Sequence, residues 1–293
     1  MSGRWNAATI DLARSLCGTQ PIKKQRSGPY TERMVDPTSN GRLLRLDRGY
    51  VEVAGQDAED FLERMLSNEV PSLEEGVARP ALLLTAKGRI IAPLRVVRTA
   101  PDDFLLVTDA SELAAPVADA LRAARFASKC EIEVRPWAGF VRFGSEPDPP
   151  AFATADFGTD AWEGWREDDD GAAADGDALE AMRIEAGTPA WGRELDDSIL
   201  PAEAGLDETH VSFTKGCFPG QEPIARLRHR GHANRRLRRI EVAAASAGDE
   251  IVWNEKVVGR VTSAVPGRAL GYVRTEVPED GVVLIGGTEA RLH

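Results

Sequence analysis

Cysteine is scarce in this sequence: Cys17, Cys130 and Cys217 are the only three among 293 residues. An odd number of widely spaced cysteines without a C-x-x-C pair favours neither a disulfide framework nor a zinc knuckle. Unpaired thiols are typical of proteins in a reducing compartment. We therefore expect the protein in the cytoplasm and predict no metal site.

Long apolar runs are also missing. No stretch of about 18 apolar residues exists, so we expect no segment to cross a membrane. The N-terminal stretch MSGRWNAATIDLARSLC carries charges and lacks a continuous apolar core, which is not the pattern of a secretory signal. Charged and apolar fractions of 28% and 42% are ordinary for a globular protein. A chain of this length exceeds one comfortable core, which predicts two or three subdomains.

Positive charge is in short supply, since the formal net charge is −11. Such a balance disfavours a nucleic-acid partner for the chain as a whole. The charge is nevertheless uneven: residues 226–239 contain seven arginines and no acid, whereas residues 156–180 contain ten acids and one arginine. The arginine run is either the solvated face of a strand or a clamp for an anion, and it lacks the interleaved aromatics that stack on bases.

Periodicity indicates an α+β protein. Residues 48–55 alternate as a strand, and residues 57–70 read as a helix with Asp57 as its N-cap. Further strands are predicted on both sides of the Lys-Gly turn within 81–97, and at 103–109, 130–135 and 138–144. A helix capped by Ser111 is predicted over 111–126. Antiparallel strands interleaved with two helices on one face predict a ferredoxin-like subdomain.

The rest of the chain divides into two further parts. Residues 145–178 are rich in Pro, Gly and Asp and are expected to be partly a loop, with Phe157, Trp162 and Trp165 holding some of it against the body. A helix over 178–186 is expected to begin with a capping box of Asp177 and Glu180 and to end at Gly187. Short strands punctuated by Gly, Pro and Asn after residue 237 predict a small β-barrel.

These patterns predict an N-terminal arm (1–40), a first subdomain (41–144), a second subdomain (145–234) and a C-terminal barrel (235–293). Cys217 lies in the second subdomain, between Gly216 and Gly220 and close to Lys215. Nearby cations and an exposing turn favour a reactive thiolate. The alternative is a small buried side chain, which is the commoner state of a free cysteine.

Two further positions have ordinary explanations. His229 and His232 are three residues apart, but Gly231 argues against a helix that would bring them to one metal. We therefore expect these histidines to be solvated or hydrogen-bonded. Glu185, near the end of the predicted 178–186 helix, could equally be surface charge.

The motif KGCFPGQE at 215–222 resembles the signature of YgfZ-type folate-binding proteins, which are linked to iron–sulfur cluster assembly and repair. That family is related to the glycine-cleavage T-protein, an aminomethyltransferase. Three other blocks, at 48–70, 83–98 and 182–206, are similar to the T-protein folate domain. The resemblance extends over roughly residues 40–290, with a weak patch at 145–178.

This resemblance implies a T-protein-like folate-binding fold: ferredoxin-like subdomains around a central cavity, closed by a C-terminal β-barrel. Its ligand would be tetrahydrofolate. Glu185 matches the acid that pairs with the pterin, and Arg226 and Arg228 would face the glutamate tail. Leu84 and Gln221 are placed at the same folate site by the resemblance.

One departure separates the two relatives. Aminomethyltransferases carry a pair of aspartates where this chain has Ala92 and Pro93, and neither of these can accept a proton. Cys217, by contrast, matches the YgfZ motif cysteine. We expect a monomeric tetrahydrofolate-binding protein that acts on iron–sulfur clients or assembly proteins through Cys217. The alternatives are a folate-dependent aminomethyltransferase, one-carbon transferase or demethylase, and a module whose arginine run docks an acidic protein. Whether the protein is an enzyme stays open at this point.

Overall fold

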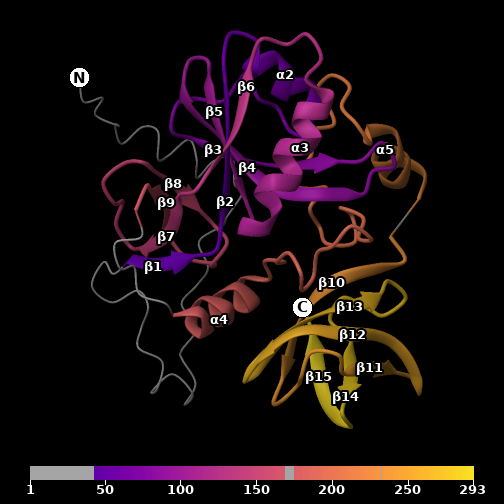
Figure 1. Cartoon of the computed structure of the whole chain (residues 1–293). Helices are drawn as coiled ribbons and strands as arrows, with labels where there is room; N and C mark the ends of the chain where they lie inside the picture. The colour runs from indigo at the N-terminus through magenta and orange to yellow at the C-terminus, as the bar shows by residue number, and fades with distance from the viewer. Residues whose placement is uncertain (1–42, 169–174, 232) are drawn as a thin grey trace.

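The computed structural model of this chain describes residues 43–168, 175–231 and 233–293. Within these ranges, the elements form a five-stranded sheet, a four-stranded sheet and a closed barrel. Figure 1 shows the two sheets at one end of the molecule and the barrel at the other, with helix α4 between them. This arrangement confirms the predicted α+β fold with a C-terminal β-barrel.

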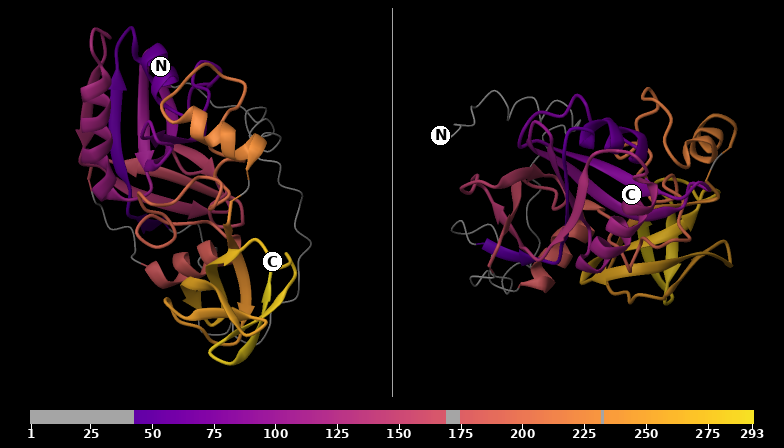
Figure 2. Two further views of the ribbon diagram at one scale, coloured as in Figure 1. Left: turned by 90° about the vertical axis from the view of Figure 1, so that its right-hand side faces the viewer. Right: turned by 45° about the horizontal axis from the view of Figure 1, so that its top comes forward.

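The five-stranded sheet is antiparallel throughout and has the order β3-β4-β5-β2-β6. Its strands are β2 (Gly49–Ala54), β3 (Ala78–Leu84), β4 (Ile90–Ala100), β5 (Asp103–Thr108) and β6 (Glu131–Arg135). Helices α2 (Ala58–Met65) and α3 (Ala114–Ala124) contribute side chains to the core on one face of this sheet (Figure 2). This part of the chain has the ferredoxin-like pattern expected from the sequence.

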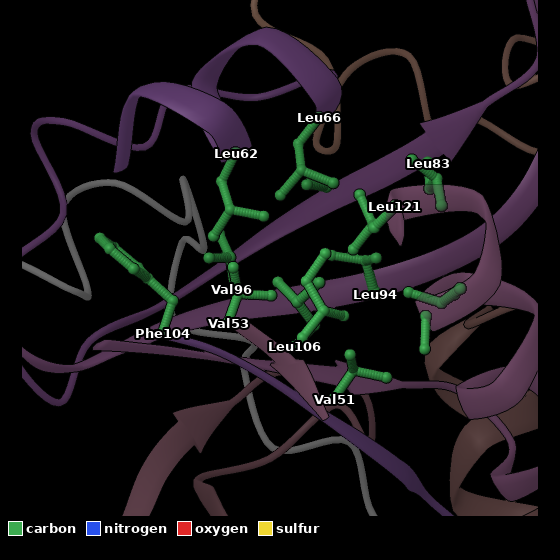
Figure 3. Packing of buried hydrophobic residues seen from close by; sticks show 14 of the residues in the cluster. Val51, Val53, Leu62, Leu66, Leu83, Leu94, Val96, Phe104, Leu106 and Leu121 are labelled. Carbon is green, nitrogen blue, oxygen red and sulfur yellow. The ribbon is translucent and has the colours of Figure 1, made fainter. Parts of the chain in front are cut away.

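Side-chain alternation builds the core between this sheet and its helices. Along β4, Ala92, Leu94 and Val96 point toward the helices and are fully buried or nearly so. Figure 3 shows Leu62 and Leu66, at and just after the end of α2, packed over this face. Because successive strand residues point to opposite faces, Pro93 and Arg95 lie on the other side of the sheet.

The second sheet covers that other side. It has the order β1-β7-β9-β8 and consists of β1 (Leu43–Leu46), β7 (Ala138–Phe143), β8 (Ala151–Thr154) and β9 (Ala161–Arg166). Phe152 and Trp165 from this sheet pack against Tyr50, Leu105 and Val107 of the first. β1 and β7 belong to the second sheet, although the sequence analysis grouped them with the first subdomain.

Several local expectations are corrected by the structure. The segment 145–178, expected to be partly a loop, also contains the strands β8 and β9. Phe157 and Trp165, each 8% exposed, pack against the body as expected, whereas Trp162 is half-buried. Ser111 caps no α-helix, because it begins a 3₁₀ turn (η2, Ser111–Leu113) that precedes α3.

The predicted helix termini were only partly right. Helix α4 (Gly176–Ala186) begins earlier than predicted, after Asp175, and Asp177 forms no capping box with Glu180. Asp57 does occupy the N-cap position of α2, but its carboxylate accepts a hydrogen bond from the Lys129 amide instead of capping the helix. Gly187 ends α4 with φ 81°, as predicted, since a left-handed position favours glycine.

The C-terminal barrel closes because β10 pairs with both β13 and β15. Its strands are β10 (Arg235–Val242), β11 (Glu250–Trp253), β12 (Lys256–Val265), β13 (Gly267–Arg274), β14 (Val282–Ile285) and β15 (Thr288–Leu292). Alternate residues such as Ile240, Val261 and Val283 fill its interior. Closure removes the exposed strand edges that would otherwise pair with other chains.

A buried polar network joins helix α4 to the barrel. Arg183 Nη1 donates to Glu194 Oε2 at 2.8 Å and to the Thr188 carbonyl at 2.7 Å. Arg183 Nη2 donates to Ser263 Oγ of β12 at 2.9 Å, and that hydroxyl donates to Glu194 Oε1 at 2.6 Å. Glu194 is 1% exposed, so its charge depends on these partners.

Replacement of Glu194 by Gln tests this junction. The substitution keeps the size of the side chain but removes the fully buried carboxylate, which leaves Arg183 with only the partly exposed Glu180 as an acidic partner. We expect the free energy of unfolding in urea to fall by about 3 kcal/mol. Glu250→Gln, which changes an exposed pair with Arg260 at 3.9 Å, should leave it nearly unchanged. Equal effects of the two variants would contradict a structural role for the network.

Candidate functional site

The loop that carries Cys217 is anchored by the buried side chain of Lys215. Lys215 Nζ donates to the carbonyls of Leu66 at 2.9 Å and Asn68 at 2.7 Å, and it lies 3.1 Å from Glu63 Oε2. The first of these carbonyls belongs to the C-cap of α2, where a cation is favoured by the unpaired carbonyls and the helix dipole. Three acceptors match the three donors of an ammonium group, so the loop has one defined position.

The chain before Lys215 is fastened to the same place. Ser212 donates its amide to the Ser67 carbonyl at 2.9 Å, and Ser67 Oγ donates to the His210 carbonyl at 2.6 Å. The Glu69 carboxylate accepts hydrogen bonds from the hydroxyls of Ser212 and Thr214. The bond from Ser212, and secondly that from Thr214, lower the pKa of Glu69 and keep it ionised.

The backbone that follows Cys217 makes a tight turn at Gly220 that only glycine fits. Gly220 has φ 81°, and a Cβ at this position would lie 2.6 Å from the Thr85 carbonyl oxygen and 2.9 Å from Gly88 Cα. The turn between β3 and β4 therefore touches the start of helix α5 (Gln221–Arg230) backbone to backbone. Between the two anchors, Phe218 is buried whereas Cys217 is exposed, so the thiol points to solvent.

Leu84 and Gln221 lie next to this loop. Leu84 is 3% exposed and belongs to the same apolar cluster as Phe218 and Ile224. Gln221 is half-buried at the first position of α5. Both residues therefore support the Cys217 loop, and Leu84 has little surface left for a ligand.

Arg226 and Arg228 lie on helix α5, not on a strand as one interpretation of the arginine run supposed. Both are exposed, and the Arg228 guanidinium stacks on the ring of Phe213 with 4.1 Å to its centroid. Helix α5 was not predicted, although Gly231 does end it, in keeping with the expectation that no helix continues through this glycine. His229 is exposed on α5, and His232 lies outside the described residues.

Glu185 lies in the last turn of α4, beside the barrel. Its Oε2 accepts a hydrogen bond from Arg268 Nε at 2.8 Å, and its carbonyl accepts one from Arg239 Nη1 at 3.1 Å. The two views in Figures 1 and 2 both separate α4 from α5. The structure thus brings Glu185 to arginines of the barrel and does not bring it to Arg226 or Arg228.

The positions of the missing aspartates face opposite sides of β4. Ala92 is fully buried under the helices, and Pro93 is buried on the side of the second sheet. Neither position offers a carboxylate. Two residues beyond Pro93 and on the same face, Arg95 is held by acids from two other segments.

Arg95 belongs to a buried ion cluster that sequence reasoning missed. Arg48 Nε lies 2.8 Å from Glu163 Oε1, and Arg48 Nη1 donates to the Asp109 carbonyl at 3.0 Å. Arg95 Nη1 lies 3.1 Å from Asp109 Oδ1, and Arg95 Nη2 pairs with Asp156. The only sequence signal was a single charged residue within each apolar strand, as in APLRVV and AWEGW.

Burial and pairing compete in this cluster. Burial alone would lower the pKa of Arg48, but Glu163 and then Asp109 outweigh it and raise that pKa. Burial raises the pKa of Asp109, and Arg95 opposes the shift. Tyr50, 1% exposed, has a hydroxyl with no hydrogen-bond partner among the described residues, and burial raises its pKa. These groups face one another between the two sheets.

His210 faces the same cluster from the segment that precedes the Cys217 loop. Its Nδ1 lies 2.7 Å from Thr209 Oγ1. Burial of the ring, together with the positive charge of Arg95, lowers the pKa of His210 to about 4. The imidazole is therefore neutral at pH 7.

The described residues contain no group of three or more His, Cys, Asp or Glu side chains arranged to hold a metal ion. Within the same ranges, no helix is long and apolar enough to span a bilayer.

Comparison with known proteins places this geometry in a context. Residues 47–137 match the family model for the GCVT N-terminal domain. The chain is 28% identical to an uncharacterized protein of Haemophilus influenzae, over 73% of this chain and 81% of that one. It is 25% identical to the aminomethyltransferase of Bacillus subtilis, over 80% of both chains. The chain is therefore related to aminomethyltransferases along most of its length.

A solved structure agrees with the observed architecture. The glycine cleavage system aminomethyltransferase T from Bartonella henselae superposes with a TM-score of 0.74 over 86% of both chains, at 20% identity. This likeness confirms the T-protein-like fold predicted from the sequence.

His210 yields a prediction about pH. A depressed pKa means that the unfolded chain binds a proton between pH 6.5 and about 4 while the folded chain does not. Stability from this residue is therefore present above pH 6.5 and falls by about 3 kcal/mol as the pH drops through that window. His210→Gln should remove this part of the pH dependence, measured as the difference between urea titrations of the two proteins. Parallel pH profiles would show that the imidazole is not desolvated.

Proposed function

We propose that the protein binds tetrahydrofolate and acts in assembly or repair of iron–sulfur clusters in the manner of YgfZ-type proteins, with Cys217 as its key thiol. The observation that carries the proposal is the mounting of this cysteine. Lys215 fixes the loop from one side and Gly220 from the other, so that an exposed thiol stands on a rigid support. A structural cysteine would instead be expected in the core, as Cys130 is.

Loss of the acid pair supports the same conclusion. An aminomethyltransferase mechanism that relies on two aspartates at this point of β4 has no proton acceptor at Ala92 or Pro93. Ala92 lies among apolar side chains of the helix-side core, where an ionised group would be strongly disfavoured. The chain has therefore kept the fold of the transferases without this part of their chemistry.

The folate proposal has two separable parts. Arg226 and Arg228 are exposed and present guanidinium groups suited to the carboxylates of a glutamate tail. Glu185 would pair with the aminopyrimidine edge of the pterin, and it must leave Arg268 to do so. Leu84 and Gln221 would act at the same site by supporting its floor.

A second candidate is a folate-dependent one-carbon transferase, including an aminomethyltransferase or demethylase. The half-buried acids Asp109 and Asp156 favour it, because they pair with Arg95 on the Pro93 side of β4 and could replace the missing pair. Formation of methylene-tetrahydrofolate from an aminomethyl donor, lost in Asp109→Asn, would decide for this candidate.

Titration calorimetry with tetrahydrofolate tests the ligand. Arg226→Ala and Arg228→Ala should each weaken binding by about tenfold, because each removes a charge-assisted hydrogen bond. Glu185→Gln tests the pterin contact separately. Arg291→Ala, an exposed arginine of the barrel, is the matched control and should bind like the wild type. Absence of binding by the wild-type protein would end the folate proposal.

Complementation tests the thiol. In a bacterial strain that lacks its own YgfZ-type protein, Cys217→Ser should fail to restore activity of iron–sulfur enzymes. Cys130→Ser is the control: burial raises the pKa of the Cys130 thiol, which keeps it protonated and unreactive. Full rescue by Cys217→Ser at normal protein abundance would show that this cysteine has no chemical role.

A further inference from the structure

The turn between α3 and β6 presents a feature that neither folding nor the proposed function explains. Phe126, two residues after the end of α3, has φ 45° and is 93% exposed. A left-handed backbone is unfavourable for a bulky side chain, and this position after a helix usually belongs to glycine. A fully exposed aromatic ring adds a second cost, since it gains nothing from burial. Costs of this kind persist chiefly at functional positions.

A hollow lies directly beside this residue. It has a volume of about 430 Å³ and lies between the outer side of α2 and the turn after α3. Its lining includes Asp60, Arg64 and Met65 of α2, and Arg125, Phe126 and Ala127 of the turn. The described residues thus place a protruding aromatic ring and a receptive depression on one face.

The walls of the hollow are held together by hydrogen bonds. Asp57 and Lys129 exchange two of them: the Lys129 amide donates to Asp57 Oδ2 at 2.7 Å, and the Asp57 amide donates to the Lys129 carbonyl at 3.4 Å. Arg64 Nη2 donates to Ser128 Oγ at 3.2 Å. The hollow is therefore formed in the free chain, which reduces the entropy lost when it is filled.

We infer that this face binds a second copy of the same chain about a two-fold axis, with Phe126 of each protomer seated in the hollow of the other. A two-fold contact requires a patch that is complementary to itself, which means a projection and a depression side by side. The charges on the rim meet the same requirement. Asp60 is exposed on one wall and Arg125 on the other, so a two-fold axis can bring each acid to the partner's arginine.

The face that carries Phe126 and the hollow lies away from the barrel, so a dimer contact there would not cover the barrel. Figure 1 shows the turn between α3 and β6 at the end of the molecule opposite the barrel. Association there leaves the barrel and its junction with α4 uncovered. The inference differs from the monomer expected from the sequence, where nothing marked Phe126 as exposed.

Phe126→Gly provides a sharp test, because glycine removes the ring and also accepts the positive φ. The wild type should associate reversibly to a dimer in sedimentation equilibrium between about 1 and about 100 μM, as expected of a small interface. The variant should stay monomeric over the same range. Its melting temperature, measured where both proteins are monomeric, should not fall, so loss of association cannot be ascribed to unfolding.

Two further variants complete the test. Val257→Thr alters another exposed apolar residue, 50% exposed on the barrel, and should leave the dimer intact. Ala127→Glu places an acid in the lining of the hollow beside an unchanged Phe126 and should weaken the dimer at least tenfold. A wild type that is monomeric at every concentration, or a Phe126→Gly variant that still dimerises, would overturn the inference.

Discussion

The ammonium group of Lys215, buried against the end of α2, is the contact on which the arrangement of the candidate site depends. Burial lowers the pKa of Lys215, and Glu63 opposes this shift, so the charge is retained only because carbonyls and a carboxylate surround it. The three groups come from 63–68, whereas the lysine comes from far along the chain. The Lys215 side chain therefore closes a loop of roughly 150 residues. It also fixes the positions of the next two residues, Gly216 and Cys217. Gly216 has open space around it, which lets the chain turn outward immediately after this anchor.

Buried charges also join the larger parts of the molecule. Arg48 and Arg95 tie the two sheets together through acids of three segments, and Arg183 ties α4 to the barrel through Glu194. Such clusters stabilise less than apolar packing of the same volume, because each ion loses its hydration. Their effect here is orientation. A guanidinium donates hydrogen bonds only in its own plane, so each cluster permits one relative position of the parts that it joins. The apolar clusters, in contrast, fill the bodies on both sides of these junctions.

The sequence predicted what depends on local patterns. Strand alternation and the helical stripe of α2 located the first sheet, and glycine punctuation located the barrel and the end of α4. Helix α2 begins after Asp57 as predicted, although the Asp57 carboxylate bonds to the Lys129 amide and does not cap the helix. The start of α4 was predicted too late, because Asp177 forms no capping box and the helix begins after Asp175. The ion cluster around Arg95 could not be predicted, since its members are single residues scattered between 48 and 163 and only the packing of two sheets unites them. At the site, the sequence left open whether Cys217 is an exposed thiol or a small buried side chain, and only the fold shows that it is exposed. The distance between Glu185 and α5, however, depends on how the barrel is joined to the sheets.

The two sides of β4 explain why an aspartate would be poorly accommodated at position 92 and at position 93. An aspartate at position 92 would enter the fully apolar core among Leu83, Leu94 and their neighbours and would be protonated or destabilising there. Position 93 lies on the other face of β4, opposite Leu82 of an apolar cluster, and Arg95 on the same face already has its charge satisfied by Asp109 and Asp156. A new carboxylate would compete with these acids for the same cation. This face of β4 thus holds a set of charges that already satisfy one another, and the exposed thiol lies on a different segment, at Cys217.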